Sequence, residues 1–318
     1  LSYEQYFQYM PSLQNLSYKD FVIGGRNQPL WIVFISLVKS IKDSYVCFHI
    51  IHSLVVNSVL LYFFSTYSNF RFTVALLFFL SFNFLYFNIE IQRESLAVIF
   101  FCISIKFILK KHYLQYYLIN CISFLFHVSA IIAFVYPLII FIIKKYRTKK
   151  LFVPIIALVI FLFINIEYAF HFIDNPITQL MYKQFTSYAN VDRNMGNIVL
   201  LSILQSIPIV LALIIYKPHD HLSDFFYCNA VFYLILILSS PYVIGLSRMS
   251  NYLLPSFFIY LVDATFKSKF NNKKKIFLIL CYVLFIILII YQYTRPSPFL
   301  GINAKLYQMY IPYKSIFD

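Results

Sequence analysis

Apolar residues fill most of this chain in long runs, which short clusters of lysine and other polar residues separate. The runs 151–166, 198–216 and 276–291 approach or reach the ~20 residues that a helix needs to cross a bilayer core. In lipid, each backbone polar group must be paired inside the protein, so a spanning segment is a helix or part of a closed barrel. These runs lack the alternation of barrel strands. The pattern therefore predicts an all-α, polytopic membrane protein.

Division at the charge clusters gives about ten transmembrane helices, and eleven or more are expected in the full-length protein. The predicted spans are 46–66, 72–88, 94–110, 113–126, 128–143, 151–168, 197–216, 225–241, 250–265 and 276–293. Residues 1–318 are treated as one integral membrane domain. The shorter run 29–38 is expected to be re-entrant or interfacial, with Pro29 at a helix start. The long polar stretch 169–196 is predicted to be an extracytoplasmic loop that caps a cavity.

The lysines predict the orientation. They gather in four short loops, and an even number of predicted spans separates each pair of consecutive loops, so all four are expected on the cytoplasmic side. The segment 113–143 is the tightest fit, because about thirty residues must supply two spans at ~1.5 Å per residue. His127 falls at the break between them. The lysine loops are 106–111, 144–150, 217 and 267–275.

Composition supports this picture, because 61% of the residues are hydrophobic and only 12% are charged. The net charge of +14 is explained by the lysine loops, and no nucleic-acid partner is expected. No cofactor or metal is expected either, because His49 and His52 lack a nearby carboxylate and their spacing is not that of a metal-binding helix. The cysteines lie within or at the ends of apolar runs and are interpreted as core thiols.

The arginines do not follow the lysines. Most fall on the predicted outer side, and the positive-inside rule does not account for them. A guanidinium grips a carboxylate or phosphate with two parallel hydrogen bonds, so these arginines indicate an anionic ligand such as a lipid-linked pyrophosphate. The alternative for any single arginine is interfacial contact with lipid headgroups. The outer arginines are Arg26, Arg93, Arg193, Arg248 and Arg295.

Three short segments carry the candidate chemistry. If the first segment, 88–97, is one helix, Glu90, Arg93 and Glu94 share a face of it. These side chains would then form either an internal ion pair or a site with a general base. His127 stands alone between apolar runs, where it is either a core residue or a donor and base in a cavity. In the third segment, Arg248 is expected to open a span, with Asn251 and Tyr252 presenting an amide and a ring to the ligand.

Five elements in order resemble a known family. An Arg-Gln-x-Leu-Ala element appears as Arg93-Glu94-Ser95-Leu96-Ala97, and about thirty residues later a Phe-His-x-Ser-Ala element appears as Phe126-His127-Val128-Ser129-Ala130. A Glu-Pro-Leu-Phe element appears as Gln28-Pro29-Leu30-Trp31. A Tyr-rich outer loop and an Arg-x-x-x-Tyr element match Tyr182 to Tyr188 and Arg248 to Tyr252. This order and spacing resemble the Wzy/EpsG-type bacterial O-antigen or exopolysaccharide polymerases. Glu94 and Gln28 depart from the pattern, and an N-terminal span of the family is expected to precede Leu1.

The resemblance implies a glycosyltransferase of polysaccharide or lipopolysaccharide biosynthesis. It would move a glycan from undecaprenyl pyrophosphate to a sugar hydroxyl of another lipid-linked repeat unit, at the periplasmic face of the cell inner membrane. Membrane lipids and a chain-length regulator are further expected partners. A flippase or transporter of lipid-linked oligosaccharides, and an O-antigen ligase or acyltransferase, are the alternatives. The expected catalytic residues are Arg93, His127, Arg248 and Glu94, and the expected substrate-binding residues are Arg26, Glu90, Tyr182, Arg193, Asn251 and Tyr252.

Overall fold

The computed structural model describes residues 3–23, 28–146, 195–241 and 244–267, with isolated positions between 272 and 290. All regular structure in these ranges is helical. The main helices are α3 (Pro29–Ile41), α4 (Tyr45–Tyr67), α5 (Arg71–Leu80), α7 (Gln92–Leu109), α8 (Tyr113–Phe126), α9 (Ile132–Tyr146), α13 (Met195–Ile215), α14 (His221–Ser239) and α16 (Leu254–Phe266). The short pieces are α1 (Tyr3–Tyr9), η1 (Leu13–Asn15), α2 (Tyr18–Ile23), α6 (Asn83–Leu85), η2 (Tyr86–Glu90), η3 (Val128–Ile131) and α15 (Ile244–Ser250).

Helices occur at each predicted span that lies within the described ranges, but the predicted number of ten membrane crossings is not confirmed. By length and composition, three described helices can each cross a membrane, at Tyr45–Tyr67, Val128–Tyr146 and His221–Ser239. A fourth crossing follows if α5 and the α6–η2 segment are one span, bent by 76°. The predicted span 151–168 lies outside the described residues. Of the predicted loop 169–196, only Met195 and Gly196 are described, and they open α13.

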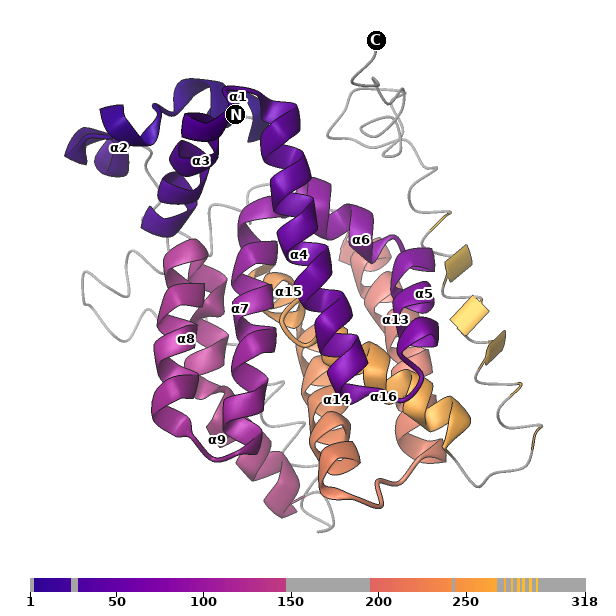
Figure 1. The fold of residues 1–318 in the computed structure, drawn as a ribbon. Coiled ribbons are helices and arrows are strands. Elements are labelled where there is room, and N and C mark those ends of the chain that lie inside the picture. Colours follow the sequence, from indigo (N-terminus) through magenta and orange to yellow (C-terminus); the bar gives the residue numbers. More distant parts are fainter. Residues whose placement is uncertain are drawn as a thin grey trace.

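The centre of the bundle is formed by α14 and α16, and nearly every residue of α16 is buried. Helices α13, α9 and α15 contact α14, while α7 pairs closely with α8 and also contacts α4 (Figure 1). The peripheral α4 exposes apolar side chains, among them Leu54, Leu61 and Tyr62. Such an outward apolar face suits a helix that borders lipid.

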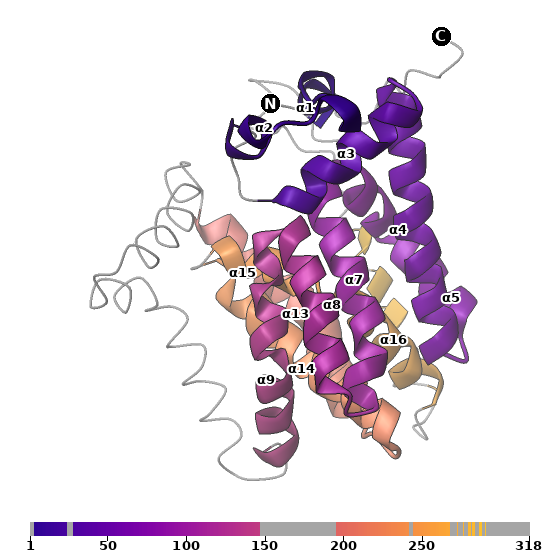
Figure 2. The same cartoon turned by 60° about the vertical axis from the view of Figure 1, so that its left-hand side comes forward.

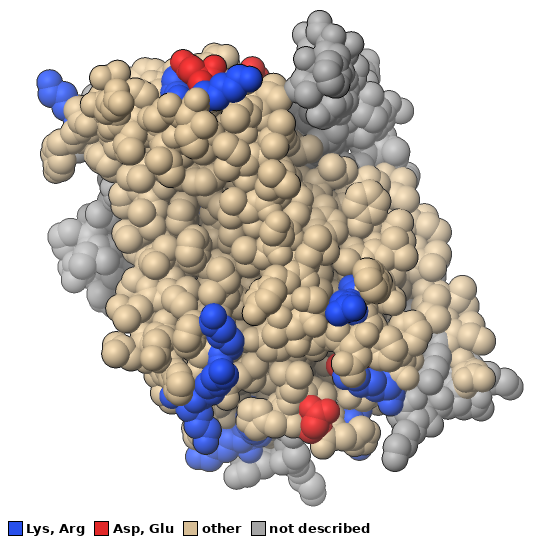
Figure 3. All heavy atoms as spheres, viewed as in Figure 1, with Lys and Arg blue, Asp and Glu red and all other residues tan. Residues whose placement is uncertain are grey.

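The two ends of the bundle differ. Helices α1, α2 and α3 lie across the end where α7 begins, in both views (Figures 1 and 2). The basic residues that end α7, α9 and α16 lie at the opposite end, where Lys144 Nζ is 3.3 Å from Asp224 Oδ2 of α14. Figure 3 shows the charged side chains on this face gathered towards the two ends, with a broad uncharged band between them. This distribution suits a protein whose middle is surrounded by lipid.

Helix α3 begins at Pro29, as predicted, and its thirteen residues extend about 20 Å, too short to cross a bilayer. It contacts α8, and Lys39 Nζ donates to the carbonyls of Phe7 and Gln8 at 3.2 and 3.0 Å. Two hydrogen bonds to the carbonyls that end α1 therefore tie α1 to α3. This pair covers the end of the bundle at which α7 begins.

Helix α7 ends in a Schellman motif that places a lysine in the left-handed region. The His112 N–H donates to the Phe107 carbonyl at 2.7 Å and the Lys111 N–H donates to the Ile108 carbonyl at 3.0 Å. Lys111 has φ 60°, a conformation that favours glycine. The motif turns the chain sharply into α8, so α7 and α8 form a tight hairpin.

Candidate functional site

Three interruptions of the helices meet at the end of the bundle beneath α1 and α3. The first is the π-helical turn η2 with Ile91, which separates Glu90 from α7. The second is His127, in an extended conformation between α8 and η3. The third is the turn between α15 and α16. Non-helical backbone at membrane depth is tolerated where protein buries it or where it lines a cavity, so their convergence marks a candidate site.

Two sequence predictions need correction here. Glu90 and Glu94 do not share one helical face, because the turn at Ile91 (φ −123°, ψ 40°) breaks the helix between them. Residues 250–265 are not one span, because the chain leaves the helix after Ser250 and α16 begins at Leu254. Arg248 therefore sits in the short helix α15 and does not open a long one.

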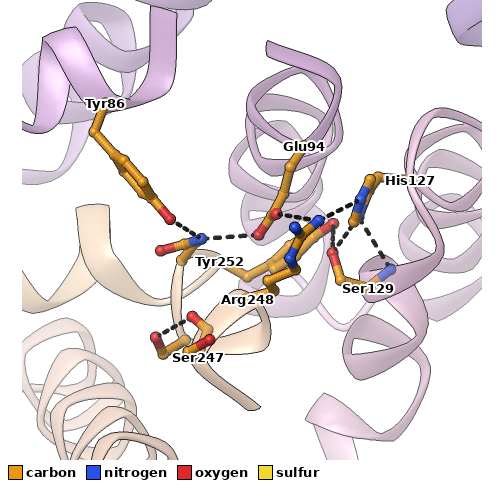
Figure 4. A network of polar contacts seen from close by, with 9 residues as sticks. Tyr86, Glu94, His127, Ser129, Ser247, Arg248 and Tyr252 are labelled. Carbon is orange, nitrogen blue, oxygen red and sulfur yellow. Dashed lines mark hydrogen bonds and ion pairs between the residues drawn. The ribbon is translucent and has the colours of Figure 1, made fainter. Parts of the chain in front are cut away.

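Glu94 is the carboxylate at the centre of the site, only 1% exposed in the first turn of α7. Its Oε1 accepts a hydrogen bond from Asn251 Nδ2 at 2.9 Å. Its Oε2 accepts none from the described residues and lies 3.9 Å from Arg248 Nη1 (Figure 4). One oxygen is thus held in place, while the other is left with an ion pair alone.

His127 lies on the other side of the same guanidinium. Its Nδ1 accepts from the Ser129 backbone N–H at 3.2 Å and is 2.5 Å from Ser129 Oγ. The Ser129 N–H and the guanidinium of Arg248 can both only donate, so they compete for the one unprotonated nitrogen of the neutral imidazole. Nε2 is 3.4 Å from Arg248 Nη1. With the hydrogen on Nδ1, the ring donates to Ser129 Oγ and Nε2 accepts from Arg248, whereas with the hydrogen on Nε2 the ring and the guanidinium both present donors at this contact.

Arg248 connects the site to the surface. Its side chain is 36% exposed, whereas Glu94 and His127 are buried. Arg248 is therefore the most accessible of these three side chains.

A buried chain of hydroxyl groups supports His127. Tyr252 is fully buried, and its hydroxyl oxygen is 3.0 Å from Ser129 Oγ, which in turn contacts the imidazole. The Tyr252 ring packs edge-on against Phe101 at 5.8 Å. Tyr252 therefore holds Ser129 and His127 in position, with its ring buried against Phe101.

Arg93 points away from this group. Its guanidinium lies over the ring of Tyr3 at 5.9 Å, and its buried Nε has no hydrogen-bond partner among the described residues. Its charge still acts on Glu94 and His127 across the first turn of α7. Arg93 therefore adds positive charge to the site without contacting its side chains.

The structure thus brings together Glu94, His127, Arg248, Asn251 and Tyr252, with Arg93 at one side. Glu90 is half-buried in η2 nearby. Sequence reasoning missed Tyr86, whose hydroxyl lies 3.4 Å from Asn251 Nδ2, and Ser129 as a positioning group. Ser129 was within a recognised motif, but no signal distinguishes Tyr86 among 28 tyrosines. Arg26, Tyr182 and Arg193 lie outside the described residues.

Comparison with known proteins gives one assignment. No curated protein and no solved structure matches the chain. The model of the EpsG family matches residues 1–315, which is nearly the whole sequence. The predicted family resemblance is therefore confirmed, and this membrane protein belongs to the EpsG family.

Proposed function

We propose that this chain is a polysaccharide polymerase that transfers a glycan from a lipid pyrophosphate to a sugar hydroxyl. Membership of the EpsG family supports a polymerase of polysaccharide biosynthesis. The observation that carries the proposal is the partly exposed guanidinium of Arg248, which lies between the buried side chains of Glu94 and His127. An oxyanion bound at this guanidinium would accept from it, as a phosphate oxygen does, and would also accept from His127 Nε2 in the tautomer that carries its hydrogen there.

In the proposed reaction, the acceptor hydroxyl oxygen attacks the anomeric carbon of the donor sugar. A glycosidic C–O bond forms, and the bond from that carbon to the pyrophosphate oxygen breaks, with its electron pair leaving on the pyrophosphate. Arg248, with the charge of Arg93 close by, stabilises the negative charge that develops there. The donor is expected to be undecaprenyl pyrophosphate, and the reaction is expected at the periplasmic face of the inner membrane.

Glu94 is the proposed general base. Both nitrogens of His127 already contact donors, the Ser129 N–H at Nδ1 and Arg248 Nη1 at Nε2, so the imidazole is poorly placed to take a proton. Glu94 Oε2 has no hydrogen bond to lose within the described part of the chain. A phosphate that draws Arg248 away from Oε2 would uncover this oxygen for the acceptor proton. Donor binding would then activate the base.

The test is chain elongation by the purified protein in lipid nanodiscs, with lipid-linked repeat units as the substrate and a gel to resolve product lengths. Glu94→Gln keeps the shape of the side chain and its contact with Asn251. We expect it to slow elongation by at least about 100-fold, the typical loss of a general base. Its affinity for the lipid pyrophosphate should not fall, because the substitution removes the ion pair from which the phosphate has to draw Arg248.

The matched control is Asp43→Asn, because the Asp43 carboxylate is 71% exposed in the loop after α3. It should elongate chains at the wild-type rate. If Glu94→Gln elongates as fast as this control, Glu94 is not the base. If wild-type protein forms no longer chains from its own repeat units, the polymerase proposal fails.

The broken helices keep a transporter as the second candidate function. The sequence predicted only the break at His127, but the structure also shows a 76° bend between α5 and the α6–η2 segment and a break between α15 and α16. Discontinuous helices at a binding site are typical of transporters. Movement of lipid-linked repeat units across protein-containing vesicles, without any lengthening, would favour this function over polymerisation.

A further inference from the structure

A second polar group lies where α1 meets the first turns of α4 and α7, and the proposed reaction does not use it. Its centre is Gln92, which is fully buried. Gln92 Nε2 donates to the Asn88 carbonyl at 2.9 Å and lies 3.2 Å from the Tyr45 hydroxyl and 3.1 Å from His49 Nδ1. We call Tyr45, His49 and Gln92 the outer amide cluster.

The hydrogen atoms of this cluster can be assigned. The Asn88 carbonyl only accepts, which fixes the orientation of the Gln92 amide, and the second amide hydrogen points to Tyr45 and His49. Both then accept, so the Tyr45 hydroxyl hydrogen and His49 Nε2–H have no acceptor among the described residues. Gln92 Oε1 likewise accepts nothing from them. The cluster offers two donors and one acceptor.

Two neighbouring groups extend this inventory. His52 Nε2 is 2.9 Å from the Gln92 carbonyl and therefore carries its hydrogen, which leaves Nδ1 as a buried acceptor without a partner in the described ranges. The buried Nε–H of Arg93 is a further unpaired donor. A buried polar atom left unpaired destabilises the fold, so the occurrence of Gln92 Oε1, His52 Nδ1 and Arg93 Nε at one place indicates groups that a ligand satisfies.

The mixture of donors and acceptors identifies the ligand chemistry. A phosphate would satisfy the donors but would place oxygen acceptors against Gln92 Oε1. A sugar hydroxyl both donates and accepts, so it suits every group of the cluster. The ring of Tyr3, half-buried beside Arg93, adds an aromatic face at the same place. Apolar and aromatic surfaces with a few convergent polar groups are typical of small-molecule sites.

We propose that the outer amide cluster binds hydroxyl groups of a neutral sugar in the lipid-linked glycan, a role that rests on the proposed polymerase function. Gln92 and Glu94 lie in one turn of α7 and, being two residues apart, point to nearly opposite sides of it. The cluster and the pyrophosphate site are thus separated by roughly the 10–12 Å width of a helix. The sugar that the cluster holds is therefore not the one attached to phosphate.

Binding measurements with two probes test this assignment. The first probe is the oligosaccharide released by mild acid from the host's own repeat units, which carries no phosphate, and the second is inorganic pyrophosphate. We expect Tyr45→Phe and His49→Phe each to weaken oligosaccharide binding by about twofold to tenfold, the effect of one lost hydrogen bond. Both should leave pyrophosphate binding unchanged. Arg248→Gln should show the reverse pattern.

Tyr62→Phe is the matched control, because Tyr62 lies on the same helix with its side chain exposed. Thermal unfolding verifies that each variant is folded, and His49→Gln provides a second polar replacement if His49→Phe is unstable. The proposal is overturned if wild-type protein shows no oligosaccharide binding at millimolar concentration, or if the Tyr45→Phe/His49→Phe double variant binds as wild type does.

Chain elongation by wild-type protein separates this proposal from the proposed function. If wild-type protein elongates chains but the Tyr45→Phe and His49→Phe substitutions do not weaken oligosaccharide binding, only the cluster proposal is refuted. Oligosaccharide binding that depends on them, in a protein that does not elongate chains, supports the cluster and refutes the polymerase.

Discussion

The ion pair between Arg248 and Glu94 predicts a strong coupling between two substitutions. Arg248→Met leaves the Glu94 carboxylate buried without its cation, whereas Arg248→Met combined with Glu94→Gln removes both charges. The attraction of two unit charges 3.9 Å apart is roughly 4 kcal/mol at an effective dielectric constant of about 20. Arg248 is 36% exposed, so water screens the pair. We therefore expect a coupling free energy of about 2 kcal/mol.

The assay is a double-mutant cycle from denaturant unfolding in detergent micelles at low ionic strength. The free energy of unfolding is measured for wild type, for each single variant and for the double variant. The double variant should be more stable than Arg248→Met alone, since no charge is stranded.

The pair formed by Lys39 and Asp43 is the control, because its nitrogen and oxygen are 3.5 Å apart but Asp43 is exposed. Its coupling should stay below about 1 kcal/mol. Equal coupling in the two cycles would refute the reasoning, because burial of Glu94 would then add nothing.

Two further predictions concern helix ends. Lys111→Gly should raise the free energy of unfolding by about 1 kcal/mol, because glycine tolerates the left-handed conformation of this residue, while Lys110→Gly (φ −86°) should give no gain. Asp220 caps α14 by accepting from the Ser223 N–H at 2.7 Å, so Asp220→Ala should cost about 1 kcal/mol near neutral pH. These hydrogen bonds lower the pKa of Asp220 below its ordinary value. This contribution is therefore complete above about pH 4 and is lost as pH falls through the lowered pKa, so wild type and Asp220→Ala should converge in acid. Denaturant unfolding curves measure both predictions, and for Asp220→Ala they are recorded at several pH values. If wild type remains more stable than Asp220→Ala in acid, the assignment of the Asp220 carboxylate as the helix cap is contradicted.

The sequence was most informative about the helices. Long apolar runs must become helices in lipid, so the positions of α4, α9 and α14 follow from hydropathy. The break at His127 was also predicted, because about thirty residues are too few for two full spans. The bend at Phe82 was not, since its left-handed conformation (φ 58°) has no signature in an apolar run. Pro255 was an overlooked signal, because proline in the first turn marks a new helix start.

The site was only partly predictable. Motif spacing identified Glu94, His127 and Arg248, but the sequence could not show that one guanidinium lies between the other two side chains. Arg93 was expected to act beside Glu94, and the structure turns it towards Tyr3, because adjacent helical residues point about 100° apart. Charge pattern alone cannot resolve such directions.

The site is assembled from distant parts of the chain, and this has a consequence for biosynthesis. Glu94 and Asn251 are 157 residues apart. At about 5–20 residues per second, the ribosome needs roughly eight to thirty seconds to synthesise the segment between them. During that interval, the α7–α8 hairpin exists without the cation and amide that later hold its acid. A chain truncated before α15 should therefore retain an unpartnered carboxylate in its core, because Arg248 and Asn251 are not yet part of it.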